Sequence, residues 1–342
     1  MKKVAVVILN YNGKPFLERF LPNVIESCDS DWVEVIVADN ASTDGSVDFM
    51  RERFPAIRLI VNGSNGGFAT GYNQALQQVE AQYYVLLNSD IEVTRGWIEP
   101  VIQLMESDPQ IAACQPKILS YHHKERFEYA GACGGFIDKY GYPFCRGRMF
   151  QHLEEDKGQY DAPMEVFWAT GACMFVRAGL YHQIGGLDDS FFAHMEEIDL
   201  CWRLKNAGYR VFCCPQSAVY HIGGGTLPKN SPRKTYLNFR NNLSLLVKNL
   251  PSDRVFPVIF CRIFLDWVAA LKFLFEGCKD DFRMVFKAHR DFFSRLKPLR
   301  EMRSKAAHHK VSCIYRKNIV IQSILLRKHK FSDLKSKDFS AY

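Results

Sequence analysis

Short apolar runs rich in β-branched residues alternate with segments of helical spacing in the N-terminal part of the chain. Gly, Asn and Asp, which are typical of turns, separate the segments. This alternation predicts βαβ units, and therefore an α/β fold with a mostly parallel, Rossmann-like sheet flanked by helices. The expected strands are residues 4–10, 33–38, 57–61 and 83–88, and the expected helices are residues 15–27, 45–53 and 70–79.

Each of these strands is followed by polar residues. Ligands of parallel α/β sheets bind at the carboxyl ends of the strands, so the pattern predicts a polar binding site at that edge. The last end carries an Asn and an Asp that suit a divalent cation and the anion which that cation carries. A simple Asx-turn is the alternative for these two residues. The four ends are Asn10-Tyr11-Asn12, Asp39-Asn40, Asn62 to Gly67, and Asn88-Ser89-Asp90.

The remainder of the chain predicts a second half of the domain and then a helical region. Residues 111–165 are expected to be irregular, with short strands and a loop over the site. The segment "EVFWATGACMFVRAGLYHQIGG" predicts a strand, a turn, a strand and a short helix, and "EEIDLCWRLKNAGYRV" predicts a helix closed by Gly208 and then a strand. We therefore expect a domain at residues 1–230, with a donor half at about 1–110 and an acceptor half at about 111–230, followed by basic helices at 231–342.

Residues 255–275 are the most apolar stretch, but Arg262, Asp266 and Lys272 interrupt it. A membrane-spanning helix needs about 20 mostly uncharged apolar residues, so a span is disfavoured. An amphipathic helix lying at a membrane interface and a helix packed on its own domain both fit the pattern, and the sequence leaves these alternatives open.

Composition excludes several classes of protein. The eleven cysteines are an odd number without C-x-x-C spacing, which argues against a disulfide framework or a zinc site. No secretory signal follows Met1-Lys2-Lys3, so we expect a cytoplasmic protein. Residues 231–342 hold 24 Lys and Arg against 9 Asp and Glu, which predicts contact with an anionic surface. The basic region lacks a nucleic-acid-binding motif, so we expect an anionic membrane surface and no nucleic acid.

Six segments in order carry a resemblance to a known family: "VVILNYNG", "VIVADNASTDGS", "NGGFATGYNQAL", "LLNSDIEV", "TGACMFVRAGLYHQIGGLDDSFFAHMEEIDLCWRLKNAGYRV" and "HIGGGT". Together, over residues 3–250, they resemble a family 2 glycosyltransferase, close to the rhamnosyltransferase-like branch that builds bacterial surface polysaccharides. The resemblance implies a GT-A fold, a nucleotide-sugar donor, Mg²⁺ or Mn²⁺, and inversion at the anomeric carbon. No G-x-G-x-x-G fingerprint occurs, which argues against a nicotinamide dehydrogenase.

The resemblance also assigns roles to residues. Asp90 would ligate the metal, and His221 would contact the metal or the diphosphate, with an ordinary loop histidine as the alternative. The Asp39 carboxylate would accept a hydrogen bond from the pyrimidine base, and Tyr11 and Asn12 would line the base pocket. Arg240 would meet the diphosphate, although a helix-surface charge is the alternative. The acceptor-binding candidates are Trp168, whose ring could stack on a sugar, Thr170, Gly171 and Ala172. The full donor-binding set is Asn10, Tyr11, Asn12, Asp39, Asn40, Asn65, Gly66, Gly67, Asn73, Asn88, Ser89, Asp90 and Arg240.

The segment "HMEEIDLCWR" is the expected catalytic centre. The family usually has a Glu-Asp pair here whose aspartate is the general base, and aligning the shared "DLC" places Glu197 at that position, directly after Glu196. Glu in place of Asp is a departure from the family, and it leaves open which of the two glutamates takes the proton. A charged first helical turn, favoured by the helix dipole, is the alternative reading. Asp199 and Arg203 are spaced for an i,i+4 salt bridge.

These features together predict an inverting, metal-dependent glycosyltransferase of cell-surface polysaccharide synthesis. It would move a sugar, with rhamnose as the candidate, from a dTDP- or UDP-sugar to a hydroxyl of a glycan or lipid-linked acceptor. The basic tail would hold the enzyme peripherally on the inner face of the plasma membrane. The alternative is a catalytically inactive nucleotide-sugar-binding scaffold of a polysaccharide assembly complex, which would bind donor without transferring sugar.

Overall fold

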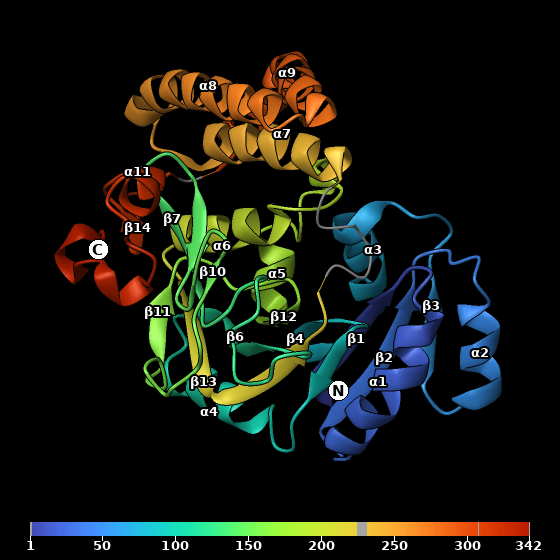
Figure 1. Cartoon of the computed structure of the whole chain (residues 1–342). Coiled ribbons are helices and arrows are strands. Elements are labelled where there is room, and N and C mark those ends of the chain that lie inside the picture. The colour runs from blue at the N-terminus through green and yellow to red at the C-terminus, as the bar shows by residue number, and fades with distance from the viewer. Residues whose placement is uncertain (1, 224–230, 307, 342) are drawn as a thin grey trace.

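A large mixed sheet forms the centre of the chain, described here from a computed structural model that covers residues 2–223, 231–306 and 308–341 (Figure 1). Its strand order is β11-β13-β6-β12-β4-β1-β2-β3, with β5 paired to β13. The strands are β1 (Lys2–Asn10), β2 (Val33–Asp39), β3 (Arg58–Val61), β4 (Ala81–Asn88), β5 (Ile91–Val93), β6 (Ile111–Ser120), β11 (Met164–Val166), β12 (Cys173–Arg177) and β13 (Arg210–His221).

The four N-terminal strands β3, β2, β1 and β4 are parallel, as the alternating pattern predicts. Their register brings the polar ends together, because Asn10 pairs with Asp39 and Leu9 pairs with Asn88. Beyond β4 the sheet is mixed: β12 runs antiparallel to β4 and β6, whereas β13 runs parallel to β6. The α/β prediction is confirmed, and the carboxyl ends of β1, β2 and β4 form one edge.

Helices cover both faces of this sheet. Alternate residues of β1 face opposite cores, with Val4, Val6 and Ile8 in one and Ala5 and Val7 in the other. Leu, Val, Ile and Met side chains from α1, α2 and α4 fill the first core, and side chains from α3, α5 and α6 fill the second. The helices are α1 (Lys14–Ser27), α2 (Ser46–Arg53), α3 (Gly67–Leu76), α4 (Glu99–Ser107), α5 (Ala178–Gln183) and α6 (Glu196–Asn206), with the 3-10 turn η1 (Asp189–Phe191) before α6.

The expectation of irregular structure throughout 111–165 is wrong for its first ten residues, which form the buried strand β6. Burial on both faces removes the polar alternation that marks a half-exposed strand. Pro116 disguises the strand further, and it lies beside an irregularity where the register with β13 shifts. The rest of the segment forms a small second sheet, as short strands were expected.

That second sheet has the order β10-β9-β8-β7-β14, and its last strand comes from the C-terminal region. β14 pairs in parallel with β7, so the chain returns to the second sheet after helices α7 to α10. The expected division at residue 230 stays a prediction. The strands are β7 (Gly135–Asp138), β8 (Pro143–Cys145), β9 (Arg148–Met149), β10 (His152–Leu153) and β14 (Ile314–Tyr315).

The C-terminal helices pack above α6 (Figure 1). Helix α7 has a buried inner face and contacts α6, α8, α9 and α10. Among the described residues, no helix is both long and apolar enough to cross a membrane. The elements are α7 (Pro232–Asn249), α8 (Ser252–Phe275), α9 (Lys279–Ser294), α10 (Leu296–Ser304), α11 (Ile319–Ile324), η2 (Phe331–Asp333) and η3 (Ser336–Asp338).

Candidate active site

The ends of β1 and β2 form a network around the buried carboxylate of Asp39. Asn10 Nδ2 donates to Asp39 Oδ2 over 2.8 Å, and the Ser42 backbone N–H donates to Asp39 Oδ1 over 2.8 Å. The Ser42 hydroxyl accepts from the Asn12 backbone N–H at 2.8 Å. A carboxylate oxygen accepts more than one hydrogen bond, so each oxygen of Asp39 retains capacity for a ligand donor. Tyr11 lies exposed beside this network, where an aromatic ring is open to a planar base.

A second group of amides continues the same edge toward β3 and α3. Asn40 Nδ2 donates to Asn65 Oδ1 over 2.9 Å and to the Gly67 carbonyl over 3.1 Å. Gly67 has φ +87°, and a Cβ there would lie 2.3 Å from the Phe192 carbonyl oxygen. Only glycine fits this left-handed position and close approach. The expected loop of Asn65, Gly66 and Gly67 is therefore packed directly against the segment that precedes α6.

Asp90 and His221 meet at the end of β4 and β13. His221 Nε2 lies 3.1 Å from Asp90 Oδ1, and its Nδ1 lies 3.1 Å from Glu128 Oε2. All three side chains are buried. Burial alone would lower the pKa of His221, but the two carboxylates raise it to about 10. Burial likewise opposes ionisation of Asp90, and His221 outweighs it to hold the pKa of that carboxyl below its usual range.

This donor set fits a divalent cation carried by a ligand. Among the residues that the structure describes, no group of three or more His, Cys, Asp or Glu side chains is arranged to hold a metal by itself. Asp90 and Glu128 hold the two ring nitrogens of His221, and a pKa of about 10 keeps the ring protonated, so His221 would ligate a cation only with loss of a proton on binding. A carboxylate behind a histidine is the usual orientation of a metal-ligating imidazole. Two protein donors suffice where phosphate oxygens complete the coordination, as is common for Mg²⁺.

Glu196 and Glu197 begin helix α6, and their environments differ. Glu196 is buried, whereas Glu197 is partly exposed. Neither Glu196 Oε2 nor Glu197 Oε2 has a hydrogen-bond partner among the described residues. Burial raises the pKa of Glu197 to about 7, and burial together with Glu197 raises the pKa of Glu196 well above its ordinary value. A carboxyl with a pKa near neutrality is suited to general base chemistry.

The turn Thr170-Gly171-Ala172 lies between the end of β4 and the glutamates of α6. The Ala172 carbonyl accepts the Asn88 backbone N–H over 2.9 Å, beside the cation candidates. At the other end, a Cβ on Gly171 would lie 3.8 Å from the Glu197 Cβ and 2.9 Å from the Phe68 ring. The structure therefore brings this predicted acceptor segment between Asn88 and Glu197.

The segment before α6 has a strained backbone, and hydrogen bonds from Asn241 of α7 hold it in place. Phe192, His194 and Met195 have φ values of 67°, 68° and 75°. Such left-handed conformations are costly for residues other than glycine and persist only when neighbours enforce them. Asn241 Nδ2 donates to the carbonyls of Phe191 (3.0 Å), Ala193 (2.9 Å) and His194 (2.8 Å). The C-terminal region thus fixes the backbone that presents the two glutamates.

Three other predicted residues are already engaged within the protein. Asn73 donates to the Leu187 carbonyl (2.7 Å) and accepts from the Tyr181 hydroxyl (2.6 Å), so its amide braces a turn. Arg240 donates to the carbonyls of Ser190 (3.1 Å) and Phe191 (3.0 Å), beside the Asn241 clamp. Trp168 is buried with its Nε1 donating to the Phe136 carbonyl over 3.0 Å. The Trp168 ring packs on Gly135 in the core, so the expected stacking on an acceptor sugar has no open face there.

Ser42, Glu128 and Asn241 are site residues that the sequence did not reveal. Ser42 lies in the quoted motif "VADNASTDGS", but its spacing alone carries no chemistry. Glu128 is distant in sequence from His221, and Asn241 is distant from the segment that it holds. Residues 224–226 of the motif "HIGGGT" lie outside the described residues.

Comparison with known proteins is consistent with this geometry. Residues 5–181 match the family described as "Glycosyl transferase family 2". The chain is 28% identical over 233 residues to an "N-acetylglucosaminyl-diphospho-decaprenol L-rhamnosyltransferase" of Mycobacterium tuberculosis (strain CDC 1551 / Oshkosh), covering 64% of this chain and 75% of that one.

Two solved structures share the fold. A mannosyltransferase from Pyrobaculum calidifontis in complex with GDP-Man and Mn²⁺ superposes with a TM-score of 0.51 at 17% identity, covering 88% of this chain and 83% of that chain. GalNAc-T7 with UDP, GalNAc and Mn²⁺ superposes with a TM-score of 0.56 at 15% identity, covering 74% of this chain and 49% of that chain. The expected GT-A fold is confirmed.

Proposed function

Because this chain belongs to glycosyl transferase family 2 and is a glycosyltransferase, we propose that it inverts the anomeric carbon of a nucleoside-diphosphate sugar with the help of Mg²⁺ or Mn²⁺. The observation that carries the proposal is the turn at Gly171, which lies between Asn88, two residues before Asp90, and Glu197. A donor diphosphate at the first centre would place its sugar toward the second. Residues 1–230 form the transferase domain in this proposal, with the donor half before about residue 110.

The donor lies along the edge formed by β1, β2 and β4. Asp39 accepts a hydrogen bond from the base, and Tyr11 and Asn12 flank it. Asn65, Gly66 and Gly67 approach the donor through backbone, since they lie where α3 begins. Asp90 and His221 would hold the cation, with Asn88 and Ser89 beside them. When bound, the cation stabilises the charge that develops on the leaving diphosphate.

Glu197 serves as the general base. Its carboxylate takes the proton of the acceptor hydroxyl while the oxygen forms a bond to C1 of the sugar. The bond from C1 to the diphosphate oxygen breaks, and its electron pair leaves with the nucleoside diphosphate. A carboxyl with a pKa of about 7, raised by burial, holds that proton more readily than an ordinary glutamate. Glu196 is buried, and burial together with Glu197 raises its pKa well above the ordinary value, so it stays protonated while Glu197 acts.

The similar proteins indicate which donor, acceptor and cation to expect in this proposal. The mycobacterial relative is named for rhamnosyl transfer to a diphospho-decaprenol-linked sugar, which supports dTDP-rhamnose as donor and a lipid-linked acceptor in polysaccharide synthesis. The structures with UDP or GDP-Man and Mn²⁺ support a nucleotide-sugar donor and a divalent cation. An acceptor of this kind would place the enzyme peripherally on the cytoplasmic face of an anionic membrane.

Release of nucleoside diphosphate from dTDP- and UDP-sugars, in the presence of acceptor and Mn²⁺, tests the proposal. Asp90→Ala should abolish Mn²⁺-dependent release, whereas the exposed Asp31→Ala should leave it unchanged. Full activity in Asp90→Ala would remove Asp90 from the cation site. Donor binding without release by the wild type, with any acceptor, would favour the inactive scaffold instead.

A further inference from the structure

Helix α8 is apolar on both sides. Its inner side packs through Val255, Val258 and Ile259 and also buries Arg262 and Asp266, while its outward positions are aromatic and aliphatic. Phe256 is 80% exposed and Phe275 is 87% exposed, so this surface is among the most open of the chain. The outward residues recur with helical spacing, and they are Phe256, Phe260, Phe264, Trp267, Val268, Leu271, Leu274 and Phe275. We call this set the apolar face of α8.

Two of the three charges that interrupt the apolar run, Arg262 and Asp266, form an ion pair inside the protein, whereas Lys272 is exposed and pairs with Glu276. Arg262 Nε donates to Asp266 Oδ1 over 2.7 Å, and its Nη1 donates to the Tyr140 carbonyl over 3.1 Å. His289 of α9 lies 3.1 Å from Asp266 Oδ2. Asp266 is the one acidic residue between positions 254 and 275, so the apolar face of α8 carries no negative charge. A helix that only packs on its own domain would carry polar residues on its outward side.

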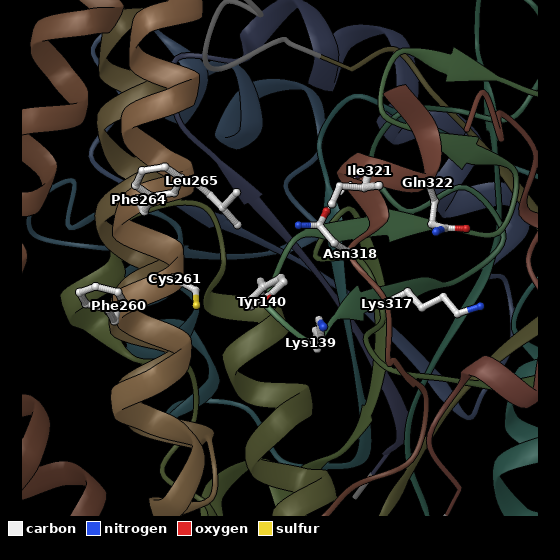
Figure 2. Close-up of a pocket in the computed structure, with 10 residues that line it drawn as sticks. All are labelled: Lys139, Tyr140, Phe260, Cys261, Phe264, Leu265, Lys317, Asn318, Ile321 and Gln322. Atoms are coloured by element: carbon white, nitrogen blue, oxygen red, sulfur yellow. Dashed lines mark hydrogen bonds between the residues drawn. The ribbon is translucent and has the colours of Figure 1, made fainter. Parts of the chain in front are cut away.

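A cavity of about 430 Å³ opens between α8 and the C-terminal helix α11. Cys261 and Leu265 of α8 face Tyr140 and Ile321 across it (Figure 2). Lys139 and Lys317 also line it, together with the polar Asn318 and Gln322, and Lys317 pairs with Asp338 at 2.7 Å. A mostly apolar lining that also holds ammonium groups is complementary to a hydrocarbon chain that bears a phosphate.

The segment around α11, across the cavity from α8, also combines exposed apolar residues with basic ones. Ile324, Leu325 and Leu326 at the end of α11 are exposed apolar residues. Residues 316–330 hold five basic residues and no acidic residue. Basic side chains next to exposed apolar ones are the combination that binds anionic lipid surfaces.

We propose that the apolar face of α8 and the end of α11 dock this enzyme onto an anionic lipid bilayer, with a lipid chain entering the cavity between them. Exposed apolar surface of this extent marks an interaction site, and Lys139 with the basic residues of 316–330 favours an anionic partner. In a two-fold dimer of this chain the same basic residues of the two copies would face one another, which is unfavourable. The inference rests on the proposed lipid-linked acceptor, since docking explains how a soluble domain reaches such a substrate.

Flotation of the full chain with vesicles tests the docking. Binding to vesicles of phosphatidylglycerol and phosphatidylcholine is expected, with little binding to phosphatidylcholine alone. Trp267 is the most exposed of the tryptophans that the structure describes, so its emission should shift to shorter wavelength on binding and be quenched by brominated acyl chains. The double variant Phe260→Glu, Phe264→Glu should lower the vesicle partition coefficient by about tenfold or more. Val61→Glu, at an exposed apolar position on the edge strand β3, is the matched control and should bind as the wild type does.

Two measurements separate docking from catalysis and from self-association. The double variant should retain the melting-temperature shift caused by nucleoside diphosphate and Mn²⁺, because Phe260 and Phe264 are solvent-exposed and far from the strand ends in the fold. Absence of vesicle binding by a wild type that still binds nucleotide would overturn the docking and leave the transferase proposal standing. A wild-type dimer that the double variant converts to a monomer, without vesicle binding, would assign the face to a second copy and also overturn the docking.

Discussion

Replacing Asp199 by asparagine removes the charge at the centre of the contact between α6 and α7. The side chain is fully buried, and Arg203 Nε donates to Asp199 Oδ2 over 2.7 Å. Lys248 Nζ lies 2.9 Å from the carboxylate, and Asn249 Nδ2 donates to Oδ1 over 2.8 Å. Asn249 and Lys248 belong to α7, so this carboxylate joins the helix of the catalytic glutamates to the C-terminal region.

The size of the effect follows from the pKa of this carboxyl. Burial alone would raise the pKa of Asp199, but Lys248 and Arg203 lower it from 3.8 to about 2. Each pKa unit corresponds to about 1.4 kcal/mol, so the ionised form contributes about 2 kcal/mol to the free energy of unfolding at neutral pH. Removing one partner of a buried ion pair costs about 3 to 5 kcal/mol when the other charge is left alone. Lys248 keeps Asp188, so we expect a loss of about 2 to 4 kcal/mol for Asp199→Asn.

The pH dependence has a defined sign. Because the folded state lowers the pKa, the stabilisation is complete above the unfolded value of 3.8 and disappears as the pH falls to about 2. The difference in unfolding free energy between wild type and Asp199→Asn should therefore be constant between about pH 8 and pH 5.5 and should shrink below about pH 4.

Urea unfolding followed by the fluorescence of the buried Trp202 on α6 measures this difference. Asp108→Asn is the matched control, because Asp108 makes a partly exposed ion pair with Arg210 and should cost less than about 1 kcal/mol. A loss below about 0.5 kcal/mol for Asp199→Asn, or a difference that is equal at pH 3 and pH 7, would refute the reasoning.

Three further predictions concern the site. Glu197→Gln should lower kcat by at least about a hundredfold with donor affinity retained, whereas Glu196→Gln should retain most activity; the reverse result would assign the base to Glu196. In the wild type, kcat should fall as the pH drops below about 7, because burial raises the pKa of Glu197 to about 7 and protonation removes the base. Glu128→Gln should weaken Mn²⁺ binding by about 10-fold to 100-fold in calorimetry with nucleoside diphosphate, since Glu128 orients His221. The exposed Glu125→Gln is its control, and equal affinities in both variants would exclude the orienting role.

Local patterns predicted the parts of the fold that depend on local sequence. The four expected N-terminal strands and three helices are present within a few residues of their predicted bounds. Parallel pairing then aligns strand ends automatically, which is why Asn10, Asp39 and Asn88 meet as predicted. The i,i+4 pair of Asp199 and Arg203 is confirmed for the same reason, because helical spacing fixes it.

Local sequence patterns do not predict contacts between segments that are distant in the chain. Nothing near Glu128 marks it as the partner of His221, and nothing near Asn241 marks it as the clamp of residues 191–194. Trp168 illustrates the same limit, since its core position depends on the approach of Gly135. From the sequence alone, Arg262 and Asp266 interrupt the apolar stretch of residues 255–275. The structure shows that Arg262 and Asp266 satisfy one another on the buried side, which a single-sequence pattern does not distinguish.

The most direct test of the central claim is the melting temperature of the folded protein with nucleoside diphosphates and nucleotide sugars, with and without Mn²⁺. A ligand that binds only the folded state raises the melting temperature by mass action. We predict a Mn²⁺-dependent rise with dTDP- or UDP-sugars that Asp39→Ala and Asp90→Ala both abolish. A folded sample that shows no shift with any nucleotide sugar would contradict the assignment of a donor site to this edge of the sheet.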